Sequence, residues 1–248
     1  MRKEISAMQC KVMTYNIQSC NDFEEKRLGS QEKLIAYLRE TDADVVVLNE
    51  VRDLPGDPLT EDQAGMIARG LGWNYRFAKA IDLYNGSYGN AFLTRHPIKS
   101  FSVTPIPLRE LEPGEEPPRW REARCVLRAE VEINGQTLVV FGSHFGLSAG
   151  EQKYAVEITS ALLDAESQPH VFMGDLNMEP DNPILAPIFA RMQDTAKVMK
   201  EQKLSHISDN PTVKIDYVFA SEGIRVLDAD IPASLISDHR PHWAIIEF

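Results

Sequence analysis

Residues 45–50 read Val-Val-Val-Leu-Asn-Glu, an apolar run that ends in an amide and a carboxylate. Residues 45–48 contain no polar side chain, whereas a strand with one solvated face alternates apolar and polar residues. The run therefore predicts a strand that is covered on both faces. Glu50 follows the run directly, so a carboxylate is expected where this buried strand ends.

Further short runs of β type lie on both sides of this segment. They occupy residues 11–15, 89–94, 125–133, 137–142, 171–173, 215–220 and 243–248. Asn134-Gly135 joins two of them, and this dipeptide is a strong signal for a hairpin of antiparallel strands. Some neighbouring strands are therefore antiparallel, and the sheets are expected to be mixed.

Helical spacing of apolar residues predicts four helices, over residues 30–40, 60–71, 148–164 and 183–193. Two of these segments open with a capping-box pattern, formed by Thr60 with Gln63 and by Ser148 with Glu151. Pro183 stands near the first turn of the last segment, where proline is favoured. The apolar stripes are interpreted as faces that pack on a core.

The composition is that of a globular protein, with 43% hydrophobic and 25% charged residues among 248. A chain of this length buries enough surface to fold without disulfides or metals as staples. No linker or internal repeat divides it, so one domain is expected over residues 1–248, with residues 1–9 as an N-terminal extension. Residues 105–118 hold five prolines and four acids and predict a long loop.

The charge balance bears on partners and location. The chain has 37 acidic and 26 basic residues, a net charge of −11, which argues against coating a nucleic-acid backbone but allows a small basic cleft. Its three cysteines form no paired motif, which favours reduced thiols and a cytoplasmic location. No signal peptide and no transmembrane segment are expected. The oligomeric state stays open.

Polar side chains stand next to many of the apolar runs. They are Asn16, Glu50, His144, Asp175, Asn177, Asp238 and His239. Any one of them is compatible with a solvated strand end, but ligand sites in sheet proteins also gather there. Carboxylates and amides suit a hard cation, Mg²⁺ or Mn²⁺, and imidazoles beside them suit proton transfer. Together they indicate the chemistry of phosphoester hydrolysis.

Several alternative enzyme classes lack their motifs in this chain. The sequence contains no GxxxxGK[ST], no HExxH and no GxSxG. This weakens the interpretations as a nucleotide triphosphatase, a zinc protease or a serine hydrolase.

Seven short motifs in order carry a resemblance to a known family. They lie at residues 13–17 (MTYNI), 47–51 (VLNEV), 89–98 (GNAFLTRHPI), 142–145 (GSHF), 174–177 (GDLN), 215–218 (IDYV) and 237–241 (SDHRP). From about residue 10 to the end, the chain resembles the endonuclease/exonuclease/phosphatase superfamily, also called deoxyribonuclease-I-like. The resemblance implies an α/β fold: a four-layered sandwich of two packed mixed β-sheets flanked by helices. It also implies an active site across the top of both sheets and a divalent metal, usually Mg²⁺.

The positions of three residues in these motifs imply that they lie on the side of the site that binds the metal. Glu50 matches the glutamate that binds metal in the family. Asp238 matches a further acid on the metal side. Asn16 matches the asparagine that helps to position metal and phosphate.

The resemblance also implies the groups that act on the phosphate. Asp175 matches the aspartate that orients or deprotonates the attacking water, and Asn177 matches the asparagine that holds phosphate. His239 matches the catalytic histidine, and Asp216 matches the acid that orients it, so we predict a hydrogen bond between them. His144 matches a second histidine of the deoxyribonuclease and sphingomyelinase branches. Whether Asp175 or His239 is the base is left open.

Two further residues are candidates for substrate binding. Arg124 follows the proline-rich segment and is compatible either with a bidentate phosphate contact or with a surface salt bridge. Tyr88 precedes Gly89-Asn90 and is compatible with a place at the border of the site or with simple packing.

The sequence thus predicts a Mg²⁺-dependent phosphoesterase, with Mn²⁺ as a possible substitute. Its substrate is expected to be a phosphodiester or phosphomonoester of small-molecule or lipid-headgroup type. The first alternative is a nuclease acting on DNA or RNA, since nucleic acid is a possible but less favoured partner. A catalytically inactive binding module on the same fold is a remote alternative, because no acid or histidine of the motifs is missing.

Overall fold

The computed structural model describes residues 8–111, 114, 116–117 and 120–248. Its first large sheet has six strands in the order β13-β14-β1-β4-β6-β5. β1 pairs in parallel with β4 and antiparallel with β14, so the sheet is mixed. The strands span Arg225–Asp230 (β13), His242–Glu247 (β14), Gln9–Asn16 (β1), Val45–Asp53 (β4), Gly86–Thr94 (β6) and Asn74–Leu83 (β5).

The second large sheet also has six strands, in the order β11-β12-β10-β9-β8-β7. β10 pairs in parallel with β9 and antiparallel with β12. The strands span Met192–Asp194 (β11), Asp216–Ser221 (β12), His170–Asp175 (β10), Gln136–His144 (β9), Arg124–Ile133 (β8) and Ile98–Ile106 (β7). The predicted hairpin is confirmed: Asn134 and Gly135 join β8 to β9 with φ values of 48° and 87°.

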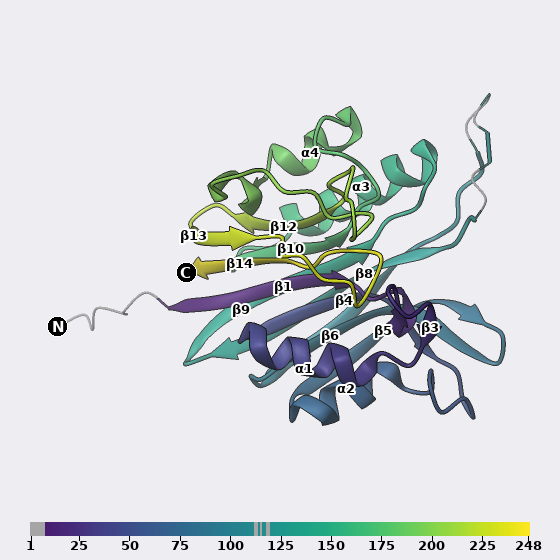
Figure 1. The fold of residues 1–248 in the computed structure, drawn as a ribbon. Helices are drawn as coiled ribbons and strands as arrows, with labels where there is room; N and C mark the ends of the chain where they lie inside the picture. Colours follow the sequence, from purple (N-terminus) through teal and green to yellow (C-terminus); the bar gives the residue numbers. More distant parts are fainter. Residues whose placement is uncertain (1–7, 112–113, 115, 118–119) are drawn as a thin grey trace.

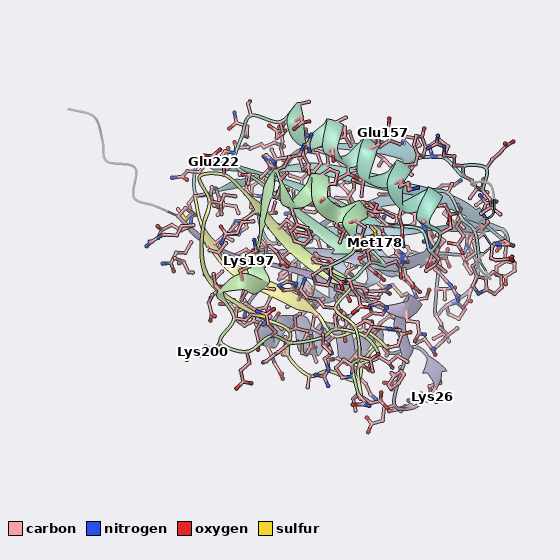
Figure 2. All side chains as sticks on the ribbon, turned by 90° about the horizontal axis from the view of Figure 1, so that it is seen from above. Lys26, Glu157, Met178, Lys197, Lys200 and Glu222 are labelled. Atoms are coloured by element: carbon pink, nitrogen blue, oxygen red, sulfur yellow. The ribbon has the colours of Figure 1, made fainter. Side chains whose placement is uncertain are left out.

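The helices cover the outer faces of the two sheets (Figure 1). α1 (Gln31–Thr41) and α2 (Gln63–Leu71) lie on one side, and α3 (Ala149–Asp164) and α4 (Ala186–Phe189) lie on the other. Seen from above, α3 with Glu157 crosses the outer face of the second sheet (Figure 2). The predicted four-layered α/β sandwich is therefore confirmed.

The apolar run at residues 45–48 shows why two sheets pack together. Val45 and Val47 belong to the core between the sheets, where they meet side chains such as Leu127 of β8. Val46 and Leu48 belong to the separate core beneath α1 and α2. Successive side chains of a strand point to opposite faces, so a run with no polar residue fills two cores at once.

Two of the predicted helices form where expected, and the third begins later. Ser148 and Glu151 make the predicted capping box at the start of α3. The prediction of a capping box at Thr60 is wrong, because α2 begins at Gln63 and its N-cap is Asp62. The Gln63 side chain is turned inward instead and donates hydrogen bonds to the Ser19 and Leu59 carbonyls.

The helix predicted over residues 183–193 is mostly wrong. The segment forms a 3₁₀ turn, η2 (Pro183–Leu185), then the four-residue α4, and then enters strand β11. Met192 is buried and pairs with Ser221 of β12. Pairing at the edge of the sheet thus overrides the helical spacing that continues through residues 192–193.

Several strands gave no signal in the sequence. β13 and β5 form the two edges of the first sheet, and β11 and β7 form the edges of the second. Side chains of an edge strand are partly solvated, so β5 and β7 mix exposed and buried residues and lack a continuous apolar run. Interior strands such as β4 and β10 were predicted because their apolar runs are buried on both faces.

The proline-rich segment also begins later than expected. Pro105 and Ile106 end β7, an edge strand where proline is tolerated, so the loop does not start at residue 105. Residues 112–113, 115 and 118 of the predicted loop lie outside the described residues.

Short elements complete the chain: 3₁₀ turns η1 (Gln18–Cys20) and η3 (Thr195–Val198), and the small hairpin of β2 (Asn21–Asp22) and β3 (Arg27–Leu28). β1 already begins at Gln9, and residues 1–7 of the expected N-terminal extension lie outside the described residues. Among the described helices, none combines the length and the apolar character needed to cross a bilayer.

Candidate active site

Register between strands brings the predicted site residues to one end of the sandwich. In the second sheet, Asp175 at the end of β10 pairs with His144 of β9 on one side and with Asp216 of β12 on the other. In the first sheet, Asn16 ends β1, and Glu50 lies beside it in β4 at an irregularity of the pairing with β6. Residues far apart in the sequence therefore meet where neighbouring strands end.

Asn16 links the two sheets through its side chain. Its Nδ2 donates to Glu50 Oε1 and to Asp175 Oδ2, both at 3.0 Å. Its Oδ1 accepts from the backbone N–H of Gln18 at 3.1 Å. Asn16 is fully buried, and its amide nitrogen holds two carboxylates in place.

Asn49 makes a second link between the sheets that the sequence analysis missed. Its Nδ2 donates to Asn90 Oδ1 at 2.8 Å and to the Ser143 carbonyl at 3.1 Å. Its Oδ1 accepts from the Asp175 backbone N–H at 3.0 Å. The sequence did contain a signal for this role, since Asn49 stands directly after an apolar run. A buried amide needs hydrogen-bond partners, and Asn49 finds them across the sandwich.

His239 and Asp216 make the hydrogen bond that the sequence predicted. Asp216 Oδ2 lies 2.9 Å from His239 Nδ1, and Asp216 has no exposed surface. Burial alone would lower the pKa of His239, but the carboxylates of Asp216 and Asp175 outweigh it and raise the pKa to about 10. His239 is therefore an imidazolium at neutral pH, with Nε2 facing Asp175 Oδ2 at 3.6 Å.

His144 has the opposite character. Arg124 Nη1 lies 3.2 Å from its Nδ1, and Asn177 Nδ2 lies 3.1 Å from its Nε2. Both neighbours offer N–H donors, and a neutral imidazole has one acceptor nitrogen, so the neutral ring accepts from only one of them. Burial and the nearby Arg124 charge hold the pKa of His144 well below its usual value, so this imidazole is neutral.

Asp175 lies between these two rings. Its Oδ2 is 3.6 Å from the Nε2 of both His144 and His239, and its Oδ1 accepts from the Asn177 backbone N–H at 2.9 Å. Burial raises the pKa of Asp175 to about 7, with His239 acting against the rise and Asp216 adding to it. A carboxyl with this pKa exchanges protons readily near neutral pH.

Glu50 and Asp238 provide the carboxylates that fit a metal. Both line the cleft, and burial raises the pKa of Glu50, with a further rise from Asp238. Gln18 Nε2 donates to Asp238 Oδ2 at 2.8 Å, and Ser237 Oγ donates to Asp238 Oδ1 at 3.2 Å. Carboxylate oxygens with side-chain amides beside them are the donor set that fits Mg²⁺ or Mn²⁺.

Compact groups of potential ligand atoms also occur around His239. Asp175, Asp216 and His239 form one group, and His206, Asp238 and His239 form another, each within 4.8 Å. Both groups include the imidazolium of His239, whose Nδ1 is already bonded to Asp216. A protonated ring does not bind a cation, so the acids on the cleft are the better candidates.

The site opens into a cleft of about 820 Å³. Tyr88 and Arg124 both line it, and Arg124 is only 9% exposed, so the salt bridge that it forms is not on the surface. Arg124 Nη1 lies 3.3 Å from Glu122 Oε2, which partly balances its charge inside the cleft wall. The outer rim carries exposed apolar side chains, namely Tyr84, Trp120 and Leu147.

The structure thus gathers all the predicted site residues around this cleft. Those that line it are Glu50, Tyr88, Arg124, His144, Asp175, Asn177, Asp238 and His239. Asn16 and Asp216 lie behind them and hold them in place. His206, which the sequence analysis did not identify, also lines the cleft, with its ring centroid 4.6 Å from that of His239.

Comparisons with known proteins found solved structures of similar fold. A structure described as an endonuclease/exonuclease/phosphatase from Beutenbergia cavernae DSM 12333 has 25% identity and a TM-score of 0.76, and the match covers 97% of this chain and 72% of that one. A protein of the same description from Bacteroides vulgatus has 17% identity and a TM-score of 0.79, with 97% and 99% covered. A mannosyl-6-phosphatase from Bacteroides thetaiotaomicron VPI-5482 has 13% identity and a TM-score of 0.76, with 96% and 100% covered.

A comparison with curated proteins found no match. The sequence profile of the Endonuclease/Exonuclease/phosphatase family matches residues 13–239, which contain every residue of the site described above. The chain therefore belongs to the endonuclease/exonuclease/phosphatase family.

Proposed function

We propose that this protein is a divalent-metal-dependent phosphoesterase that hydrolyses a small phosphodiester or phosphomonoester. The observation that carries the proposal is the position of Asp175 between a neutral and a cationic imidazole, each 3.6 Å from the same carboxylate oxygen. Members of the family are generally hydrolases of phosphoesters. The arrangement offers a base, a cation and a neutral imidazole around one point, as in-line attack on phosphorus requires.

Each residue has a separate part in the proposed reaction. Glu50 and Asp238 would hold Mg²⁺ or Mn²⁺, which supplies Lewis-acid polarisation of the phosphoryl group when bound. Asp175 accepts a proton from the attacking water. The Nε2–H group of His239 donates a hydrogen bond to a phosphoryl oxygen as negative charge grows there, and the neutral ring of His144 lies on the other side of Asp175.

The two pKa values favour Asp175 over His239 as the base. A base must be unprotonated at the working pH, and the pKa of His239 is raised to about 10. Asp175, with a pKa of about 7, is substantially ionised near neutral pH. His239 then serves as a fixed positive charge whose orientation depends on Asp216.

Charge and one relative support a small substrate. The net charge of −11 disfavours long polyanions, and one structure of similar fold is a mannosyl-6-phosphatase. We therefore place small phosphoesters and lipid headgroups before DNA and RNA. The buried, unpaired thiols of Cys10, Cys20 and Cys125 support a cytoplasmic location.

Hydrolysis of bis-p-nitrophenyl phosphate tests the proposal. Purified protein is expected to release p-nitrophenolate with Mg²⁺ or Mn²⁺ and to stop when EDTA is added. Asp175→Asn should lower the rate by roughly 10²–10⁴-fold, the range for an acid–base group. Glu157→Gln, on the exposed outer surface of α3, is the matched control and should keep full activity. Equal rates with metal and with EDTA would refute the metal-dependent reaction.

A further inference from the structure

His206 stands where two hollows of the surface meet. The cleft of about 820 Å³ holds the candidate active site, and a neighbouring groove of about 620 Å³ runs beside it. Asn177 and His206 line both hollows. A phosphate placed beside Asp175 and Asn177 would therefore have room for one substituent in the cleft and for another in the groove.

The backbone around His206 is fixed to the loop that carries His239. Ser208 N–H donates to the Asp238 carbonyl at 2.8 Å, and Arg240 N–H donates to the Ser205 carbonyl at 2.7 Å. Ser208 Oγ donates to the Ser237 carbonyl at 2.7 Å. These bonds give the His206 ring a defined position relative to the reacting centre, as a substrate-contacting group requires.

The ring of His206 keeps its polar atoms available. It packs on His239 at a tilt of 40°, and it is half-buried. Within the described part of the chain, no hydrogen bond to either ring nitrogen is found. Packing on His239 alone would be served equally well by phenylalanine, whereas a histidine at the junction can also donate to an oxygen of a ligand.

The groove beyond His206 is polar and acidic at its outer edge. Glu179 and Asp181 are exposed there, and Asn182 lies beside them. Val213 and Ile215 supply apolar surface on its inner side. Carboxylates repel a second phosphate and accept hydrogen bonds from hydroxyl groups, so the groove fits an alcohol without further negative charge.

We propose that the substrate is a phosphodiester whose non-leaving group is a hydroxyl-bearing alcohol, and that His206 contacts this group in the groove. This inference rests on the proposed phosphoesterase function and narrows its substrate class. His206 is then a specificity residue: it acts on the second ester group, which a phosphomonoester lacks.

Two substrates with the same leaving group test the inference. These are p-nitrophenyl phosphate and its glyceryl ester, glyceryl p-nitrophenyl phosphate, assayed with Mg²⁺ or Mn²⁺. The wild-type protein should prefer the glyceryl diester in kcat/KM by roughly tenfold or more, the value of one hydrogen bond to a buried polar group. His206→Phe keeps a ring against His239 but loses the donor. It should cost roughly tenfold on the diester, mainly through KM, and leave the monoester within about threefold.

Two further variants complete the design. His206→Gln places an amide donor near the same position and should recover part of the preference for the diester. Leu204→Ala, at an exposed residue of the same segment that lines neither hollow, should match the wild-type protein on both substrates. Circular dichroism and thermal unfolding show whether each variant is folded.

Three results would overturn the inference. If His206→Phe hydrolyses the diester with the same kinetics as the wild-type protein, the ring of residue 206 only supports His239. Equal losses on both substrates would mean that His206 acts through His239 and not on the second ester group. A wild-type preference for the monoester would contradict the substrate class. If the wild-type protein hydrolyses neither compound nor bis-p-nitrophenyl phosphate, the proposed function itself is wrong, and the inference fails with it.

Discussion

Two histidines of the same chemistry acquire opposite charge in this site because of their neighbours. His239 faces the carboxylates of Asp216 and Asp175, and its pKa is raised to about 10. His144 is buried and faces Arg124, and its pKa is lowered well below the usual value. Groups whose surroundings push their pKa values apart can take different parts in one reaction.

At Glu50, we expect Glu50→Gln to weaken Mn²⁺ binding by roughly 100-fold. Outer-sphere changes already cost 10–100-fold in metal affinity, and this substitution removes an anionic oxygen. Glutamine still accepts the hydrogen bond that Asn16 donates to Oε1, so the fold should persist. Isothermal titration measures the affinity, with Glu157→Gln as the control. Unchanged affinity in Glu50→Gln would remove Glu50 from the metal site.

At Asp216, we expect Asp216→Asn to shift the pH profile of kcat/KM. In the wild-type protein, activity should rise as Asp175 loses its proton near pH 7 and fall as His239 loses its proton near pH 10. The Asp216 carboxylate stabilises the charged ring, so its removal lowers the pKa of His239 and moves the alkaline limb to lower pH. Asp209→Asn, at an exposed position, should leave both limbs in place. An alkaline limb that stays near pH 10 in Asp216→Asn would contradict the role of Asp216.

At the scale of elements, the site depends on irregularities at the ends of strands. Glu50 has a φ of 61° and lies where the pairing of β4 with β6 shifts between Leu48 and Val51. A bulge changes which face the following side chains point to. Leu48 and Val51 both pack under the helices, while Arg52 reaches the cleft, so the bulge allows the outer part of β4 to line the site.

A buried ion pair connects β11 with the start of β12. Lys214 Nζ lies 3.1 Å from Asp194 Oδ2, and both side chains are almost fully buried. Burial lowers the pKa of Lys214 to about 8, and Asp194 opposes this effect. The pair is thus compensated only while Asp194 keeps its charge.

We therefore expect Asp194→Asn to lower the free energy of unfolding by about 3–5 kcal/mol, because it leaves Lys214 buried without a counter-charge. Asparagine keeps an oxygen for the Ala196 N–H, so the cap of η3 should survive. Urea unfolding followed by circular dichroism at pH 7 measures the loss. Asp164→Asn removes an exposed partner of Arg191 and should cost less than about 1 kcal/mol. Equal effects of both substitutions would show that burial of the pair is unimportant.

At the scale of the whole molecule, charge limits the size of the substrate. The body carries a net charge of −11, and the acids Glu179 and Asp181 edge the groove beside the site. Arg52 and Arg124 face the cleft, but Glu122 partly balances Arg124. Tracking a duplex needs several unbalanced cations along the path of its phosphates. Arg121 Nε lies 3.6 Å from Glu151 Oε1, so its charge is also partly balanced.

We expect kcat/KM for small phosphoesters to exceed that for duplex DNA at ~150 mM salt, close to physiological ionic strength. Kinetics on supercoiled plasmid, short RNA and bis-p-nitrophenyl phosphate under one buffer condition measure the ranking. Lower salt should narrow the difference, since repulsion and phosphate contacts both depend on screening. Efficient plasmid nicking at ~150 mM salt would instead support the nuclease alternative.

The interior of the fold was predictable from the sequence. The strand at residues 45–48, the hairpin at Asn134-Gly135 and the capping box at Ser148 each depend on local pattern, and the structure contains all three. The edge strands β5, β7, β11 and β13 were not predictable, because their side chains are partly solvated and follow no continuous apolar run. The position of each edge strand is fixed by hydrogen bonds to the backbone of the neighbouring strand.

The same division holds for the candidate site. The acids, amides and histidines at strand ends could be identified from the sequence by itself, because each belongs to a short local motif. Only the tertiary structure determined that Asn49 bridges the sheets, that His206 packs on His239, and that His144 is neutral while His239 is charged. The physical reason is that pKa values and hydrogen-bond partners depend on distances between groups on different strands. Those distances are fixed by the packing of two sheets, which no short stretch of sequence contains.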